Sequence, residues 1–140
     1  IDLGSKRIGV ATSDRSGTIA TPLTVLKRSG SRETDYRAIA ELVAEYEIEC
    51  VVVGLPLHMN GNYGDAAKSA VAEVQQLTSV LSVPVLTFDE RRTTVTADNI
   101  LMEQNMNAQE RRKVIDKVAA AVMLQSWLDG RKMTEARSRD

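Results

Sequence analysis

Carboxylates occur in three separated stretches of the sequence, each inside or at the end of an apolar run. Asp2 lies in the opening run IDLG, Asp89 and Glu90 follow the run VLTF, and Asp116 lies in KVIDKVAAAVML. A carboxylate in apolar surroundings is costly unless it is paired or bound to a metal ion. Three acids brought together from separate segments suit a pair of Mg²⁺ ions, which can hydrolyse a phosphodiester by stabilising the attacking and leaving oxygens. The residue types therefore predict a two-metal site.

Each of these acids also has a purely structural explanation. Asp2 could cap the turn that follows it, and Asp116 could pair with Lys113 or Lys117 on the surface of a helix. Arg91 could contact the scissile phosphate or form an ion pair with the acid two positions before it. The spacing of the residues leaves these alternatives open.

The opening stretch IDLGSKRIGVATSD predicts a strand, a tight turn and an antiparallel strand. Gly4 or Ser5 is expected to take the positive φ that a short hairpin needs. The bases Lys6 and Arg7 follow immediately. An acid beside glycine and bases suits phosphate chemistry in two ways, because the acid can hold a cation or backbone N–H groups can hold the phosphate.

The rest of the chain predicts a mixed sheet flanked by helices. A third strand over residues 18–26 contains Pro22, which favours a sheet edge. Apolar periodicity then predicts further strands over residues 49–57 and 83–89, and helices over residues 34–47 and 67–81. A helix over residues 93–103 could be capped by Thr93 or Thr94. The last helix is expected over residues 107–128, capped by Asn107 with Glu110. Gly130 is expected to stop the last helix, leaving residues 131–140 as a polar tail.

This order of elements places the candidate acids together. Three antiparallel strands followed by right-handed β-α-β crossovers give a five-stranded α/β sheet in which the fourth strand lies beside the first. The carboxyl ends of the first, fourth and fifth strands then meet at one edge, where functional residues collect in such sheets. Asp2, Asp89 and Glu90 are expected at that edge, with Asp116 approaching from the last helix.

Composition limits the class of protein. The chain has 140 residues, 43% hydrophobic and 26% charged, which suits one globular domain. No apolar run approaches the roughly 18 residues of a membrane helix. The single cysteine, Cys50, cannot form an intrachain disulfide, so a reducing cytoplasm is the expected location. Because the chain lacks an initiator Met and opens inside a predicted strand, we expect several native residues before Ile1.

Four motifs, in this order, resemble the YqgF (RuvX) family: IDLGSKRIGVA, VVVGLPLHMNG, DERRTT and IDKVAAAVMLQ. The resemblance extends over residues 1–128, and four collinear motifs are far more specific than any one of them. The family consists of ribonuclease H-like proteins described as Holliday junction resolvases and as pre-16S rRNA nucleases. The resemblance implies a ribonuclease H-like α/β fold, with residues 1–130 forming a single nuclease domain.

The resemblance also implies roles for particular residues. Asp2, Glu90 and Asp116 take the catalytic, metal-binding positions, with two Mg²⁺ or Mn²⁺ ions as the cofactor. Related resolvases carry an acid on the fourth strand, where this chain has VVVGLP, so Glu90 would have to substitute for it. The implied partners are structured RNA such as pre-rRNA, branched DNA or a ribosomal particle, with no membrane, and the chain is expected to be a monomer or homodimer.

Binding of a polyanion must depend on local basic patches, since the formal net charge is −1. The bases expected to contact nucleic acid are Lys6, Arg7, Arg91, Arg92 and Arg112. His58 is expected to be a solvated loop residue, and Trp127 to belong to the core.

Two other classes of function compete with a metal-dependent nuclease. The stretch DLGSKRIG could be the phosphate loop of an actin-type or sugar-kinase ATPase, although those proteins need two such domains with a cleft between them. A non-catalytic module for nucleic-acid binding or ribosome assembly could keep the same fold. Cleavage assays on pre-rRNA and a four-way junction, with Mg²⁺, Mn²⁺ and EDTA compared, separate these classes.

Overall fold

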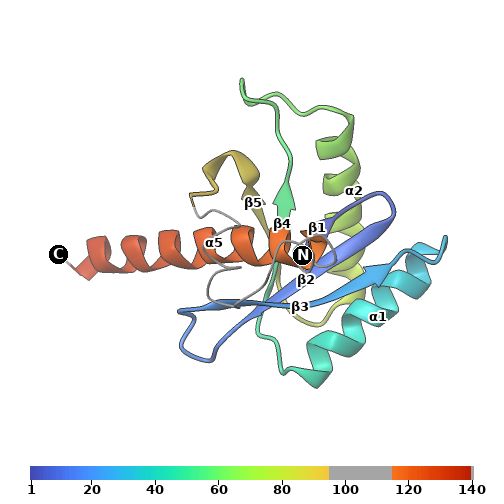
Figure 1. Cartoon of the computed structure of the whole chain (residues 1–140), viewed down its shortest axis with the longest axis horizontal. Coiled ribbons are helices and arrows are strands. Elements are labelled where there is room, and N and C mark those ends of the chain that lie inside the picture. Colours follow the sequence, from blue (N-terminus) through green and yellow to red (C-terminus); the bar gives the residue numbers. More distant parts are fainter. Residues whose placement is uncertain (95–114, 140) are drawn as a thin grey trace.

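The computed structural model describes residues 1–94 and 115–139, with the side chains of the last helix described over residues 117–134. The strands are β1 (Asp2–Leu3), β2 (Arg7–Ser13), β3 (Ala20–Lys27), β4 (Val51–Leu55) and β5 (Val85–Asp89). The helices are α1 (Arg32–Glu45), α2 (Asp65–Val80), the short η1 (Glu90–Arg92) and α5 (Ile115–Arg139) (Figure 1). No helix within these ranges is long and apolar enough to cross a membrane.

The sheet has the predicted mixed topology. Strands β1, β2 and β3 form an antiparallel meander, and β4 pairs with β5 in parallel, with Val51 opposite Val85. Ile1 joins the two parts, because its backbone nitrogen donates to the carbonyl of Val52 (2.7 Å) and its carbonyl accepts from the N–H of Gly54 (3.2 Å). Bonds from one residue to two positions i and i+2 are the parallel pattern. The fourth strand therefore lies beside the first, and β3, which carries Pro22, lies at an edge.

Helices cover both faces of the sheet. Ile8 and Val10 of β2 pack with Ile39 of α1 and Leu77 of α2 on one face. On the other face α5 lies across β2 and β3, where Ala121 and Leu128 pack against Ala20 (Figure 1). All five residues of β4 are buried, as predicted for a strand covered on both sides.

The prediction of a positive φ at Gly4 or Ser5 is wrong, because neither residue has one. Glycine is needed at position 4 for a different reason. The Gly4 N–H donates to the carbonyl of Arg7 (2.9 Å), and a Cβ on Gly4 would lie 2.5 Å from that oxygen. The constraint at this turn is close backbone approach.

The prediction that Gly130 stops the last helix is also wrong, because α5 continues through it to Arg139. Contacts beyond the glycine offset its helix cost of about 1 kcal/mol. The Arg131 guanidinium lies 5.3 Å from the centre of the Trp127 ring, and the Lys132 ammonium donates to the Thr18 hydroxyl (2.8 Å). Thr93 and Thr94, the predicted caps of a helix over residues 93–103, follow η1 and are not helical. The rest of that predicted helix and the Asn107–Glu110 cap lie outside the described residues.

A buried ion pair joins the β1–β2 turn to the helices on one face. The guanidinium of Arg28, just after β3, donates two hydrogen bonds of 2.8 Å to the carboxylate of Glu73 in α2. Its Nε donates to the carbonyl of Gly4 (2.7 Å), and the Tyr36 hydroxyl of α1 donates to Glu73 (2.6 Å). The Glu73 side chain is only 4% exposed, so the pair is almost removed from water.

Removing Glu73 should destabilise the fold in a pH-dependent way. Glu73→Ala leaves Arg28 largely buried without its partner, which costs about 3 kcal/mol at neutral pH. Burial alone would raise the pKa of Glu73, but the hydrogen bonds from Arg28 and Tyr36 outweigh it and lower the pKa below the ordinary 4.5. This stabilisation is present above pH 4.5 and is lost as the pH falls through the lowered pKa.

Urea unfolding of wild type and Glu73→Ala from pH 7 to pH 3 measures this effect. The difference in unfolding free energy between the two should shrink toward the acid end. Glu41→Ala, which removes an exposed glutamate of α1, is the control and should change stability by less than about 0.5 kcal/mol. A difference that stays constant with pH would contradict a charged Glu73.

Candidate active site

Two acids meet at the carboxyl edge formed by β1, β4 and β5. Asp2 is the first residue of β1, and Glu90 directly follows β5. Both side chains are partly buried. The pKa of Glu90 is raised, first by burial and then by the negative charge of Asp2, with a smaller contribution from Asp89 and an opposing one from the amino group of Ile1. Two like charges that interact in a partly buried site favour a bound cation.

The Glu90 carboxylate lies over β4. A Cβ on Gly54 would stand 2.6 Å from Oε1 of Glu90 and 3.2 Å from its Cδ. The space above β4 is therefore free only because position 54 has no side chain. The Glu90 carboxylate therefore reaches from the end of β5 over β4, a strand that has no acid of its own.

Asp89, the other acid at the end of β5, is engaged elsewhere. Its carboxylate accepts from Nη2 of Arg91 at 2.5 Å and from Nε at 3.0 Å. These hydrogen bonds lower the pKa of Asp89. Of the two adjacent acids, Asp89 is paired with Arg91, whereas Glu90 lies over Gly54 and interacts electrostatically with Asp2. The ion-pair alternative for Arg91 is the one observed.

Arg91 also holds the loop between β4 and α2. Its Nη1 donates to the carbonyl of Met59 (3.3 Å), and the same atom lies 3.3 Å from where a Cβ on Gly61 would stand. Gly61 has a φ of 87°, and its N–H donates to the carbonyl of His58 (2.8 Å). The loop is irregular, as predicted, but its backbone is closed by hydrogen bonds. His58 is exposed, as expected of a solvated loop residue.

The remaining predicted site residues are only partly described. Asp116 is the second residue of α5, but its side chain lies outside the described residues, as does the whole of Arg112. Within the described part of the chain, no three His, Cys, Asp or Glu side chains form a group that could hold a metal ion. Lys6 and Arg7 are exposed in and beside the β1–β2 turn, and Arg92 is exposed in η1.

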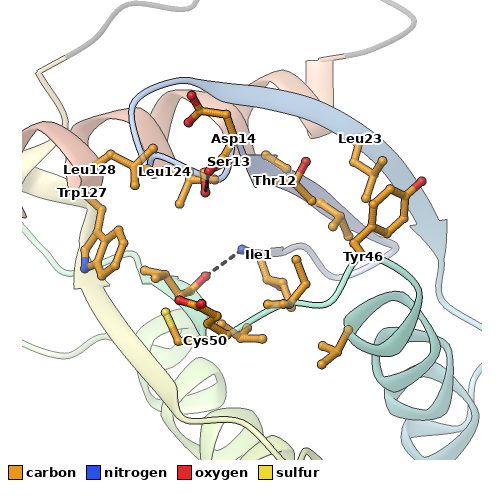
Figure 2. Close-up of a pocket in the computed structure, with 18 of the residues that line it drawn as sticks. Ile1, Thr12, Ser13, Asp14, Leu23, Tyr46, Cys50, Leu124, Trp127 and Leu128 are labelled. Atoms are coloured by element: carbon orange, nitrogen blue, oxygen red, sulfur yellow. Dashed lines mark hydrogen bonds between the residues drawn. The ribbon is translucent and has the colours of Figure 1, made fainter.

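A cavity of about 680 Å³ lies away from these acids. Figure 2 shows it bordered by Tyr46 after α1, Cys50 before β4, and Trp127 of α5. Neither Asp2 nor Glu90 lines it. Cys50 and Tyr46 precede β4, whereas the acids gather where the parallel strands end, so the cavity is separate from the candidate active site.

Sequence reasoning did not identify Gly54 as a site residue. The signal was present in the motif VVVGLP, where one glycine interrupts a run of large apolar residues in a buried strand. Such a glycine often marks close approach of another group. The partner that approaches is far away in the sequence and becomes evident only in the fold.

Gly54→Ala should displace the Glu90 carboxylate with little cost to stability. The atom that must move is the end of a flexible side chain, so the unfolding free energy should change by less than about 1 kcal/mol. With Glu90 in its predicted role as a metal ligand, affinity for Mn²⁺, measured by calorimetry, should fall at least about tenfold, because a displaced ligand binds poorly. In a Glu90→Gln background the same substitution should have no further effect, and a further loss there would contradict the assigned contact.

Asp2→Asn should lower the pKa of Glu90 in the metal-free protein. A raised carboxyl pKa means that the folded state holds its proton to higher pH than the unfolded state, so stability falls as the pH rises through this range. Removing the Asp2 charge removes one cause and makes that fall smaller. The carboxyl ¹³C resonance of Glu90, followed by NMR against pH, reports the shift. The exposed Asp65→Asn is the control, and an unchanged Glu90 titration in Asp2→Asn would contradict the proximity.

The chain matches one family model and is similar in sequence to proteins of known name. The family model RuvX, described as Holliday junction resolvase, matches residues 1–130. A protein of Thermoanaerobacter pseudethanolicus named "Putative pre-16S rRNA nuclease" is 43% identical over 133 residues, covering 94% of this chain and 95% of the relative. A protein of the same name from Anaeromyxobacter sp. is 46% identical over 131 residues, with 94% and 95% covered.

Solved structures agree on the fold. The structure titled "T. thermophilus RuvC in complex with Holliday junction substrate" matches with a TM-score of 0.54 and 17% identity, over 94% of this chain and 92% of that chain. At this identity the likeness establishes the fold alone, and it confirms the predicted ribonuclease H-like arrangement. The family match over residues 1–130, together with relatives above 40% identity, shows that this chain belongs to the RuvX family of Holliday junction resolvases.

Proposed function

We propose that this protein is a metal-dependent nuclease that hydrolyses phosphodiester bonds in structured nucleic acid, through 5′-end processing of pre-16S rRNA, Holliday junction resolution or both. Membership of a nuclease family fixes the enzyme class. The observation that supports the site is the position of Glu90, over Gly54 and in electrostatic interaction with Asp2. We place the activity in the cytoplasm, with the chain acting as a monomer or homodimer on free nucleic acid or on a ribosomal particle.

Asp2, Glu90 and Asp116 would hold the metal ions, Mg²⁺ or Mn²⁺, and we propose two of them. The described residues fit a hard cation, because the carboxylates of Asp2 and Glu90 interact electrostatically in a partly buried site. Among the described residues the positive charge that opposes the raised pKa of Glu90 is the amino group of Ile1, and a bound cation would add to it. Bound ions would activate a water and stabilise charge on the phosphate.

The protein's own part is to position these carboxylates. Gly54 leaves room for Glu90. Arg91 forms an ion pair with the ionised Asp89, so the negative charge of Asp89 contributes less to the pKa of Glu90 than burial and Asp2 do. Lys6, Arg7, Arg92 and Arg112 are proposed to contact substrate phosphates. Arg91 is also proposed to contact a substrate phosphate, and it would do so while its guanidinium is paired with Asp89.

Asp2→Asn should abolish metal-dependent cleavage and leave nucleic-acid binding nearly intact. The substitution barely alters volume, and loss of a metal contribution of several kcal/mol should slow single-turnover cleavage at least about 100-fold. Labelled pre-rRNA and a four-way junction, each tested with Mg²⁺, Mn²⁺ and EDTA, decide between the two substrates. Asp65→Asn is the matched control. Cleavage by Asp2→Asn at the wild-type rate would contradict the assignment of Asp2 to the nuclease site. Binding of nucleic acid by the wild type without any metal-dependent cleavage would indicate a non-catalytic module.

Asp116→Asn separates a metal ligand from a surface ion pair. As a ligand beside Asp2, Asp116 repels it in the metal-free protein, so the substitution should preserve or raise the melting temperature without metal and abolish cleavage. As a surface partner of a lysine it would cost about 0.2 to 1 kcal/mol and leave cleavage untouched. Melting curves with and without Mg²⁺ measure this. An unchanged Mg²⁺-induced stabilisation would remove Asp116 from the site.

A further inference from the structure

Basic side chains gather around a depression beside the β1–β2 turn. It has a volume of about 450 Å³, and its lining includes Ser5, Lys6, Lys27, Arg28, Arg32 and Asp35. The four bases come from three separate segments, namely the turn, the end of β3 with the residue after it, and the first residue of α1. In a chain with a formal net charge of −1, this is a local concentration of positive charge.

Backbone contacts fix where these bases emerge. The N–H of Arg28 donates to the carbonyl of Lys6 (2.9 Å), and Lys27 lies opposite Arg7 in the β2–β3 register. Lys6 and Lys27 therefore project from the same end of the hairpin. Nη1 of Arg32 donates to Oε1 of Gln76 (3.3 Å), which holds this side chain toward α2.

The four bases differ in how an acid compensates their charge, because Glu73 pairs with Arg28 and also interacts, more weakly, with the charge of Arg32. Arg28 is neutralised by Glu73, so its role is structural. In the described part of the chain, Lys6, Lys27 and Arg32 form no salt bridge. The acids near these bases, Asp35 and Glu33, form contacts with other groups.

Asp35, the one acid in the lining, is 6% exposed and accepts from the N–H of Ser29 (3.0 Å). Glu33 pairs with Arg37 on the exposed side of α1 (3.2 Å). The positive amino-terminal end of the 14-residue α1 adds to the field at the depression.

The depression lies at the same edge as the candidate active site. The turn that bears Lys6 directly continues β1, which begins at Asp2, and Nε of Arg28 fixes that turn through the carbonyl of Gly4 (2.7 Å). A polynucleotide that crosses Asp2 and Glu90 can therefore continue over these bases. Its phosphates recur at every nucleotide, so a second contact needs no particular base sequence.

We propose that Lys6, Lys27 and Arg32 bind a backbone phosphate of the nucleic-acid substrate outside the catalytic centre. The substrate class rests on the proposed function, whereas the subsite is defined by the charges and their placement. Arg32 can engage two phosphate oxygens with its planar guanidinium, and the two lysines act as point charges. The subsite positions the substrate, so its loss is measured as an increase in Kd.

The test uses Lys27→Ala/Arg32→Ala in an Asp2→Asn background, so that the substrate is not cut. Both residues are exposed, and neither belongs to the set of bases expected from the sequence. Fluorescence anisotropy with labelled structured RNA and a four-way junction, at several salt concentrations in EDTA, gives Kd and its salt dependence. The Kd should rise about tenfold at 100 mM salt, and the slope of log affinity against log salt should fall by about 1 to 2.

The matched control is Arg15→Ala/Lys132→Ala, which removes the same charge at the other end of the β2–β3 hairpin. Its Kd should change less than twofold. Equal weakening by both double variants would overturn the subsite in favour of a diffuse field. Weaker binding of inorganic phosphate alone, with nucleic-acid affinity unchanged, would also overturn it.

The two proposals fail separately. A Lys27/Arg32 effect on binding in a protein that never cleaves would leave the subsite standing and remove the nuclease assignment. Metal-dependent cleavage in the wild type, with no effect of Lys27→Ala/Arg32→Ala on binding, would support the nuclease assignment and remove the subsite. Melting temperatures within about 2 °C of the parent variant confirm that each double variant is folded.

Discussion

The buried pair of Arg28 and Glu73 is the interaction on which the placement of the active edge depends. Two charges removed from water are stable together only when their hydrogen bonds are complete, and Tyr36 and the Gly4 carbonyl complete them. Gly4 follows Asp2 by two residues. The end of β1 is therefore fixed by contacts with α1 and α2, on the face of the sheet that those helices cover.

Space above β4 is the second constraint on the site. Glu90 can lie over β4 only because Gly54 has no Cβ, and burial together with the Asp2 charge raises its pKa. Two like charges in a partly buried site destabilise the folded state. Such unfavourable arrangements are typical of functional sites. The neighbouring Asp89 shows the ordinary outcome, since Arg91 neutralises it and the same guanidinium ties down the loop after β4.

The order of strands and helices was predictable because it depends on local periodicity. A continuous apolar run such as VVVGL indicates a strand buried on both faces, and alternation around the turn at Gly4 indicates a hairpin. The stop expected at Gly130 failed because Trp127 and Thr18 provide contacts that hold Arg131 and Lys132 in the helix. A local propensity of about 1 kcal/mol is easily overridden by such tertiary contacts.

By itself, the sequence determined the chemical types available to the site: Asp2 on the first strand, an acid pair after the fifth, and the glycine within VVVGLP. The family motifs carried that information because each is short and contiguous. Only the tertiary structure shows how the surroundings of Asp89 and Glu90 differ, because one carboxylate pairs with Arg91 and the other lies over Gly54. The same holds for Arg28, which could have been a phosphate ligand. Its partner Glu73 lies 45 residues away, and ionic interactions over such separations are set by packing rather than by sequence spacing.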